Sequence, residues 1–374
     1  MTINKLIFLI PILYCLQVNA QQLHSRAIGR KIAFPDIPGY KTLKCDFHQH
    51  SVFSDGSVWP DIRVEEAIRD GLDAISLTEH LEYQPHKDDI PHPDRNRAYI
   101  LALNYAKDQG LLITNGSEIT RSMPPGHTNA IFLTDANKLL LDDPIEVFRE
   151  ANNQGGFTFW NHPNWIAQVE DGIAKLTDMH EKLIADGLLH GIEVVNDLTY
   201  SAEALQIALD NNLTIMGTSD IHGLVDWQFE INQGGHRPIT LVFSKEKSLE
   251  SIKEGLENQR TVVWFNNLLI GKSEFVIPLI QQSLSITEAK YIGKSNVLSV
   301  LIENNSDADY FLENQSGFTF HSDQNLIIIG TNKTTKLEIK TLERLESVDI
   351  KFRVLNAIIA PDVHPEITLE IKVD

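Results

Sequence analysis

Imidazole and carboxylate side chains recur at one kind of place in this chain, at the ends of short apolar runs. The first example is Asp46-Phe47-His48-Gln49-His50, in which His48 and His50 are two residues apart. Residues i and i+2 of a strand point to the same face, so these two imidazoles can reach one metal ion. The polar turn over residues 51–56 adds the carboxylate of Asp55. The segment therefore predicts a metal site at the end of a strand.

The same residue types follow later apolar runs. Those that stand directly after a run are His80, Glu118, His162, Asp220 and His222, whereas His127 stands just before one. In a β/α barrel the C-terminal ends of the strands converge on one mouth, where ligands bind. We therefore expect these side chains to form one cluster, with the loop after Glu118 holding His127 at the same end.

A cluster of imidazoles and carboxylates suits zinc, manganese or iron better than calcium or magnesium alone. The candidate ligands outnumber what one ion needs, so two or three divalent ions are expected, and such centres carry out hydrolytic displacements. The alternative is a set of separately buried histidines. It leaves unexplained why a ligand-type residue stands beside so many predicted strands.

Strand and helix patterns alternate from about residue 43 to residue 265. The predicted strands, which are short apolar runs, are 43–47, 74–78, 111–115, 129–133, 157–160, 191–195, 214–217, 239–243 and 262–265. The predicted helices between them are 61–70, 95–109, 144–154, 174–186, 202–211 and 248–258. This alternation predicts a parallel sheet, closed into a barrel or doubly wound.

The pattern changes after about residue 271. Short alternating runs predict strands at 296–303, 325–329, 335–340, 348–355 and 366–373, and no long helix is expected from residue 275 onward. Turn residues such as Asn304-Asn305-Ser306 separate the runs. We expect a small β-sandwich here.

The ordered motifs resemble the polymerase and histidinol phosphatase (PHP) superfamily. The matching segments are Asp46-Phe47-His48-Gln49-His50-Ser51, Ser54-Asp55-Gly56, Thr78-Glu79-His80, Gly116-Ser117-Glu118, His127, Asn161-His162-Pro163 and Ser219-Asp220-Ile221-His222. The resemblance implies a distorted (β/α)7 TIM-like barrel, two or three metal ions, and hydrolysis of phosphoesters. It also implies three ligand sets: His48, His50, Glu118 and Asp220; Glu118, His127 and His162; and Asp55, His80 and His222. Because bound metals lower the pKa of water to about 7, the expected mechanism is attack of a metal-bridging hydroxide on phosphorus.

The first twenty residues have the features of a secretory signal peptide. Lys5 precedes an apolar stretch over residues 6–18, and Ala20 ends a small-residue cleavage site. The apolar stretch is too short for a membrane span. The expected organisation is a signal peptide at 1–20, a lead-in at 21–42, the PHP barrel at 43–271 and the β-sandwich at 272–374. We expect a secreted protein of the bacterial periplasm or exterior, resembling exported phosphodiesterases of this superfamily.

The net charge of −19 argues against a nucleic-acid platform. The expected partner is a small organic phosphate ester, and no oligomeric state follows from the sequence. Arg121, three residues after Glu118, is the best candidate for a phosphate clamp, and His236 and Arg237 are further candidates for substrate contact.

Three other functions compete with phosphodiester hydrolysis. One is a phosphomonoesterase of the same fold. Another is an amidohydrolase-type enzyme acting on C–N or C–O bonds, since such barrels also begin with a His-x-His pair. The last is a metal-storing or carbohydrate-binding protein without catalytic activity.

Overall fold

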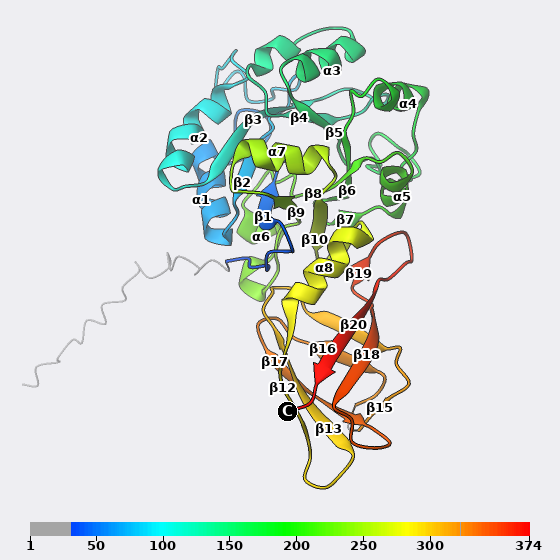
Figure 1. Cartoon of the computed structure of the whole chain (residues 1–374). Coiled ribbons are helices and arrows are strands. Elements are labelled where there is room, and N and C mark those ends of the chain that lie inside the picture. Colours follow the sequence, from blue (N-terminus) through cyan, green and yellow to red (C-terminus); the bar gives the residue numbers. More distant parts are fainter. Residues whose placement is uncertain (1–30, 322) are drawn as a thin grey trace, which may run out of the picture.

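A computed structural model describes residues 31–321 and 323–374. The predicted signal peptide at 1–20 lies outside the described residues. Figure 1 shows a larger body, in which helices surround a curled sheet, and a smaller all-β body that contains the C-terminus. The fold is a distorted TIM-like barrel followed by a β-sandwich, as the sequence predicts.

The barrel is built on a twelve-stranded sheet. Its strands are β1 (Lys41–Asp46), β2 (Ala74–Leu77), β3 (Leu112–Ile119), β4 (Thr128–Ile131), β5 (Phe157–Trp160), β6 (Gly191–Asn196), β7 (Thr199–Tyr200), β8 (Thr214–Thr218), β9 (Ile239–Ser244), β10 (Thr261–Phe265), β11 (Leu268–Gly271) and β19 (Ala357–Ile358). Their order is β19-β11-β10-β9-β1-β2-β3-β4-β5-β6-β7, and β8 lies beside β6.

The expectation of a parallel sheet is only partly right, because the sheet is mixed. Strands β1, β2 and β3 are parallel, as are β5, β6 and β8, but β4 is antiparallel to both β3 and β5. Strand β9 is also antiparallel to β1 and β10. A parallel neighbour needs a crossover of a dozen or more residues. The chain between β3 and β4 is shorter than that and holds no helix, so β4 returns beside β3.

Side-chain hydrogen bonds bring β8 against β9 and β10. The Thr240 hydroxyl donates to the Gly217 carbonyl at 2.8 Å and accepts from the Gly217 N–H at 2.9 Å. The Thr261 hydroxyl donates to the Ile215 carbonyl at 2.8 Å. A Cβ at Gly217 would lie 2.2 Å from Val263 Cγ1, so a glycine is needed for this close approach.

The predicted barrel helices are present close to their expected positions, and the structure adds a short helix at 225–228 that was not predicted. The barrel helices are α1 (Pro60–Asp70), α2 (Arg97–Asp108), α3 (Pro144–Asn153), α4 (Asp178–Ala185), α5 (Ala202–Asp210), α6 (Val225–Gln228) and α7 (Leu249–Glu257). Helix α1 has Pro60 in its first turn and ends at Gly71, whose φ is +75°. Helix α4 begins four residues later than predicted, because Thr177 caps it through the His180 N–H.

The C-terminal domain consists of two four-stranded antiparallel sheets, with the orders β12-β13-β17-β15 and β16-β14-β18-β20. The strands are β12 (Leu284–Tyr291), β13 (Val297–Asn304), β14 (Tyr310–Asn314), β15 (Thr319–Phe320), β16 (Leu326–Ile329), β17 (Thr334–Lys340), β18 (Ser347–Val354) and β20 (Glu366–Lys372). Buried and exposed residues alternate along β18 and β20, as expected for one face on a core. The predicted β-sandwich is confirmed.

One helix contradicts the prediction for this region. Helix α8 (Ser273–Ser283) contains Pro278, a residue that removes a backbone donor and argues against a helix. The helix persists because Val276, Leu279 and Ile280 are buried in the core. Tertiary packing overrides the local signal here.

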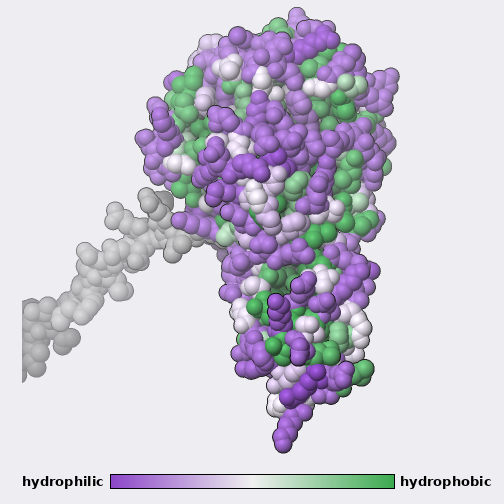
Figure 2. Space-filling model, viewed as in Figure 1, coloured by the Kyte–Doolittle hydropathy of each residue, from purple (hydrophilic) through white to green (hydrophobic). Residues whose placement is uncertain are grey.

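Barrel and sandwich share one hydrophobic core, which runs from α1 and α2 through α8 into both sheets of the sandwich. Strand β19 also pairs with β11, with Ala357 beside Leu269. The boundary at residue 272 stays a prediction. In Figure 2 the barrel is mostly hydrophilic on the face shown, and apolar residues gather near the junction and over the sandwich. No helix of the described residues is long and apolar enough to cross a membrane.

Candidate metal centre

Backbone hydrogen bonds join the segments that carry the candidate ligands. The N–H of Asp220 donates to the His48 carbonyl at 2.9 Å, and the N–H of His50 donates to the Ile221 carbonyl at 3.0 Å. The end of β2 is joined to the same loop, since the Thr78 N–H donates to the Gln49 carbonyl at 2.9 Å. The strand ends are thus fixed to one another, which limits how far the ligands can move.

The antiparallel course of β4 explains the position of His127. The residue precedes its strand, whereas the other candidates follow theirs. Because β4 runs opposite to β3 and β5, its N-terminal end lies beside their C-terminal ends, and the Asn161 N–H donates to the His127 carbonyl at 3.0 Å. His127 lies in the loop after Glu118, as expected, and the antiparallel course of β4 is what allows this loop to be short.

The Glu118 carboxylate lies at the centre of the cluster. His127 Nδ1 and His162 Nε2 are 3.1 and 3.3 Å from its Oε1 atom. On the other side, His80 Nδ1 is 2.5 Å from Oε2. The Asn161 amide donates to Oε1 at 2.8 Å and helps to fix the carboxylate. Glu118 is therefore placed to bridge more than one ion.

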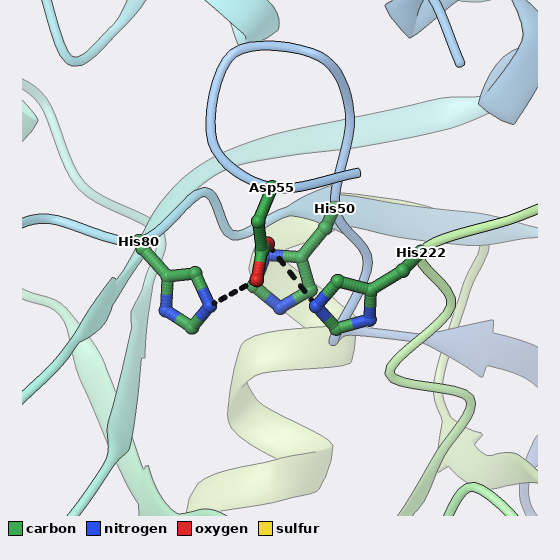
Figure 3. A group of neighbouring side chains, drawn as sticks. All are labelled: His50, Asp55, His80 and His222. Carbon is green, nitrogen blue, oxygen red and sulfur yellow. Dashed lines mark ion pairs between the residues drawn. The ribbon is translucent and has the colours of Figure 1, made fainter. Parts of the chain in front are cut away.

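A second group lies around Asp55 and is drawn in Figure 3. The two carboxylate oxygens of Asp55 face two imidazoles, His80 Nε2 at 3.3 Å and His222 Nε2 at 3.1 Å. The His50 ring lies behind them in the same group. These four side chains come from three separate loops and could together hold one ion.

A third group joins His48, His50 and Asp220. The Oδ1 atom of Asp220 is 3.0 Å from His48 Nε2 and 3.1 Å from His50 Nε2. His50 thus belongs to two groups, and His80 joins Glu118 and His127 in another. The structure brings all nine predicted residues together, although these groups differ in part from the ligand sets that the resemblance implies.

Two kinds of observation show that the cluster suits metal ions. First, Asp55 Oδ1, Glu118 Oε2 and Asp220 Oδ1 are buried without a hydrogen-bond partner, although each faces an imidazole nitrogen. A bound cation would satisfy all three oxygens. Second, His48 Nδ1 lies 2.7 Å from a Glu193 carboxylate oxygen and His222 Nδ1 lies 2.7 Å from the Asp220 carbonyl. Donation at Nδ1 leaves the Nε2 lone pair of both rings toward the cluster, as metal ligation requires.

The electrostatic potential at the site also favours cations. Burial lowers the pKa of His80, but Glu118 and Asp55 outweigh burial and raise that pKa to about 10. Burial would raise the pKa of Glu118, yet His80 and His48 hold it well below its usual value. His50 differs, because burial lowers its pKa to about 3. Carboxylates that stabilise the protonated form of His80 would also attract a divalent cation, and that cation would replace the proton.

Glu193 is a functional candidate that the sequence reasoning missed. It lies in β6, is 1% exposed and accepts four hydrogen bonds. Its Oε1 atom accepts from His48 Nδ1 at 2.7 Å and from the Thr218 hydroxyl at 2.6 Å, while Oε2 accepts from the His162 N–H at 2.7 Å and from the Asn196 amide at 2.8 Å. One carboxylate therefore orients two candidate ligands. The signal in the sequence that could have identified it is a single glutamate in the otherwise apolar stretch over residues 191–195.

Glu79 supports the centre from the other side. Its carboxylate accepts hydrogen bonds from the hydroxyls of Ser51 and Ser54 and, at 3.1 Å, from the Ser51 N–H. The Ser54 hydroxyl also lies 3.2 Å from His50 Nδ1. This network fixes both the loop that carries Asp55 and the ring of His50.

A cavity of about 860 Å³ opens beside the centre. Seven of the nine candidate ligands contribute to its lining, together with aromatic and neutral polar residues. Among the described residues that line it there is no lysine or arginine. An anionic group bound here would therefore depend on the metal ions for its neutralisation.

The structure does not place Arg121 at this cavity. Its Nε atom is 2.6 Å from Glu82 Oε1, and its terminal nitrogens donate to the carbonyls of Leu141 and Asp142. These contacts direct the guanidinium away from the cluster, so the expected phosphate clamp has no structural support. Arg237 is fully buried and pairs with Asp46 and Asp70, which rules out the expected substrate contact.

His180 anchors the loop that leads to His127. Its Nε2 atom donates to the Pro125 carbonyl at 2.7 Å, Nδ1 accepts from the Thr177 N–H, and its ring stacks on Trp160 with centroids 3.9 Å apart. Burial lowers the pKa of His180 to about 4, an effect that the bond to Pro125 partly offsets. The ring is therefore neutral in the folded protein at neutral pH.

This shift predicts a loss of stability in acid. The unfolded chain binds a proton at His180 near pH 6.5, and the folded chain does so only near pH 4. Between these values the unfolded state holds more protons, so stability falls as the pH drops from 6.5 toward 4, by about 3 kcal/mol from this residue. The check is urea unfolding at pH 7 and pH 4.5 for the wild type and His180→Gln. The variant should lose less stability on acidification, and equal losses would refute the assignment.

The chain is similar to a solved structure over almost its whole length. A crystal structure of a two-domain protein containing a predicted PHP-like metal-dependent phosphoesterase, from Bacteroides vulgatus, is 43% identical to the chain. The match covers 92% of this chain and 99% of that protein, with a TM-score of 0.86. The family DUF5001, described as an Ig-like domain, matches residues 284–370. No curated protein matches the chain.

More distant structures are also found. A putative metal-dependent phosphoesterase from Bifidobacterium adolescentis is 19% identical over 48% of this chain and 88% of its own, with a TM-score of 0.38. An amidohydrolase from Chromobacterium violaceum is 16% identical over 48% of this chain and 87% of its own, with a TM-score of 0.35. Similarities this low do not bear on the activity.

Proposed function

The chain belongs to the family of PHP-like metal-dependent phosphoesterases, and from this premise we propose that it is an exported phosphodiesterase with two or three metal ions. The observation that carries the proposal is the central Glu118 carboxylate, which faces His80, His127 and His162 within 3.3 Å at the wall of an open cavity. A carboxylate that three imidazoles approach from different strands is suited to bridge ions in such a centre.

The candidate ligands would hold manganese, zinc or iron, which would supply Lewis acidity and lower the pKa of a bound water to about 7. The protein side chains would hold the metal ions and orient the ligand rings. Asp55, Glu118 and Asp220 provide negative charge that keeps divalent ions in place. Glu193 fixes the ring of His48, and the Glu79–Ser54 pair fixes the ring of His50.

The cavity supports a diester rather than a monoester as the substrate. A phosphodiester carries one negative charge, whereas a phosphomonoester carries up to two at neutral pH. No lysine or arginine lines the described part of the cavity, so a second charge on the substrate would gain no basic partner there. The volume of about 860 Å³ also leaves room for an organic group on each side of a phosphate.

A panel of chromogenic substrates tests this proposal. The metal-loaded protein should hydrolyse bis(4-nitrophenyl) phosphate with a higher kcat/KM than 4-nitrophenyl phosphate, and it should leave 4-nitroanilides and lactones unchanged. An Asp220→Asn variant, purified in parallel, reports any contaminating activity. Faster turnover of the monoester would favour the phosphomonoesterase, and turnover of the anilide or lactone alone would favour the amidohydrolase-type reaction.

Export is supported by the first twenty residues, with Lys5, an apolar stretch at 6–18 and Ala20 before a cleavage site. Expression of the full chain in a bacterial host, followed by fractionation and mass measurement of the intact protein, tests this part. The expected product is a periplasmic or extracellular protein that begins at Gln21. A cytoplasmic protein with an intact N-terminus would contradict it.

A further inference from the structure

One part of the cavity lining is aromatic and apolar. It consists of Tyr83, Trp165 and Ile166, which we call the aromatic wall. The Trp165 ring lies 5.6 Å from His127 and 5.2 Å from His162, and the Tyr83 ring lies 5.6 Å from His80. Tyr83 and Trp165 are 51% and 44% exposed. Large aromatic side chains left this exposed beside the candidate ligands provide a surface for an apolar or aromatic group.

Another part of the lining is polar. It consists of Asn196, Asp197, Thr199 and Gln228, which we call the polar wall. The Asn196 amide donates to Asp220 Oδ2 at 3.3 Å, so this wall also begins beside a candidate ligand. The Gln228 amide donates to Asp197 Oδ1 at 2.6 Å and orients the carboxylate. Asp197 belongs to none of the groups that could hold a metal ion, so the metal centre does not account for it.

Asp197 also adopts a backbone conformation that favours few residue types. Its φ is +50°, in the left-handed region, where aspartate and asparagine are tolerated better than most residues. The turn between β6 and β7 thus places a carboxylate at the cavity at some conformational cost. An ionised carboxylate accepts hydrogen bonds and donates none, so hydroxyl groups of a substrate are suitable partners. A second anionic group on the substrate would be repelled.

We infer that the substrate is an unsymmetrical phosphodiester, with an aromatic or apolar ester group on the aromatic wall and a hydroxyl-bearing ester group on the polar wall. The inference rests on the proposed function, since it assigns the two groups that flank the phosphate. It assigns Asp197 and Trp165 as specificity determinants with no part in holding the metal ions.

Two matched diesters test the polar wall, 4-nitrophenyl 2,3-dihydroxypropyl phosphate and 4-nitrophenyl propyl phosphate, which differ only in two hydroxyls. The wild type should favour the dihydroxypropyl ester about 10-fold in kcat/KM, the size of a good hydrogen bond. Asp197→Gly should abolish the preference, and Asp197→Asn should reduce it. Glycine and asparagine both tolerate the positive φ at this position. Leu198→Ala is the control, because Leu198 is an exposed neighbour outside the cavity lining.

A further variant, Trp165→Ala, tests the aromatic wall. It should raise KM about 5-fold for both diesters, as expected for a lost aromatic contact, and leave the preference for the dihydroxypropyl ester intact. An unchanged KM for both esters would remove the assignment of the aromatic wall.

The outcomes distinguish failure of this inference from failure of the proposed function. Hydrolysis of both esters with equal kcat/KM, or a preference that survives in Asp197→Gly, overturns the inference and leaves the phosphodiesterase standing. A wild type that prefers the 3-aminopropyl ester over the dihydroxypropyl ester also overturns it, because the polar wall would then recognise a cation. Failure of the metal-loaded wild type to hydrolyse any phosphoester overturns the proposed function itself.

Discussion

Replacement of Glu118 by glutamine is expected to release metal from the centre and to lower phosphodiester hydrolysis by on the order of 100- to 1,000-fold, the range seen when transition-state charge stabilisation is lost. The carboxylate faces His80, His127 and His162 within 3.3 Å and is fully buried. The amide has no negative charge, and its nitrogen cannot ligate an ion. Metal content by elemental analysis and kcat/KM on bis(4-nitrophenyl) phosphate check the prediction.

The matched control for this change is Glu146→Gln. Glu146 lies in the first turn of α3, has a side chain 51% exposed, and pairs with Arg149 on the surface. The control should retain full metal content and full activity. Wild-type metal content and activity in Glu118→Gln would contradict the bridging position of this residue.

Replacement of Glu193 by glutamine is expected to weaken metal binding by about 10- to 100-fold, the usual cost of losing a partner of a metal-ligating histidine. All four contacts of the carboxylate come from donors. The amide nitrogen of glutamine would replace one of the two oxygens. It would then face either His48 Nδ1 and the Thr218 hydroxyl or the His162 N–H and the Asn196 amide, and it would disturb the candidate ligand on that side. The apparent Kd for the activating metal, from activity titrated against free metal, is the readout.

Rescue by metal separates positioning from simple loss of structure. At saturating metal, the activity of Glu193→Gln should return to within severalfold of the wild type, because Glu193 contacts no substrate in this account. Glu203→Gln, an exposed change on α5, serves as the control. A wild-type Kd in Glu193→Gln, or an activity loss that saturating metal does not relieve, would contradict the positioning role.

The candidate ligands could be read from the sequence because a strand end is a local feature. The two-residue period of a strand places His48 and His50 on one face, and apolar runs before Glu118 and His162 mark where strands stop. The structure brings these residues together as expected. Helix positions could also be predicted, because Pro60 and Gly71 are local signals for the start and the end of α1.

Other features of the structure were not predicted from the sequence. The loop after Glu118 was expected to hold His127, but the antiparallel course of β4 beside β3 and β5 was not predicted. Arg121 is close to Glu118 in sequence, but ion pairing with Glu82 decides where its guanidinium lies. Helix α8 exists in spite of Pro278, because the shared core buries its apolar side. Contacts between distant segments decide the position of the Arg121 guanidinium and the presence of α8.

Hydrolysis of bis(4-nitrophenyl) phosphate by metal-free and by reloaded protein shows whether the activity depends on bound metal ions. The full chain would be stripped with a chelator, reloaded with manganese, zinc or iron(II), and assayed together with elemental analysis. We expect no hydrolysis by the metal-free protein and recovery of activity as two or three ions bind per chain. Equal hydrolysis by the metal-free and reloaded protein would contradict a metal-dependent activity.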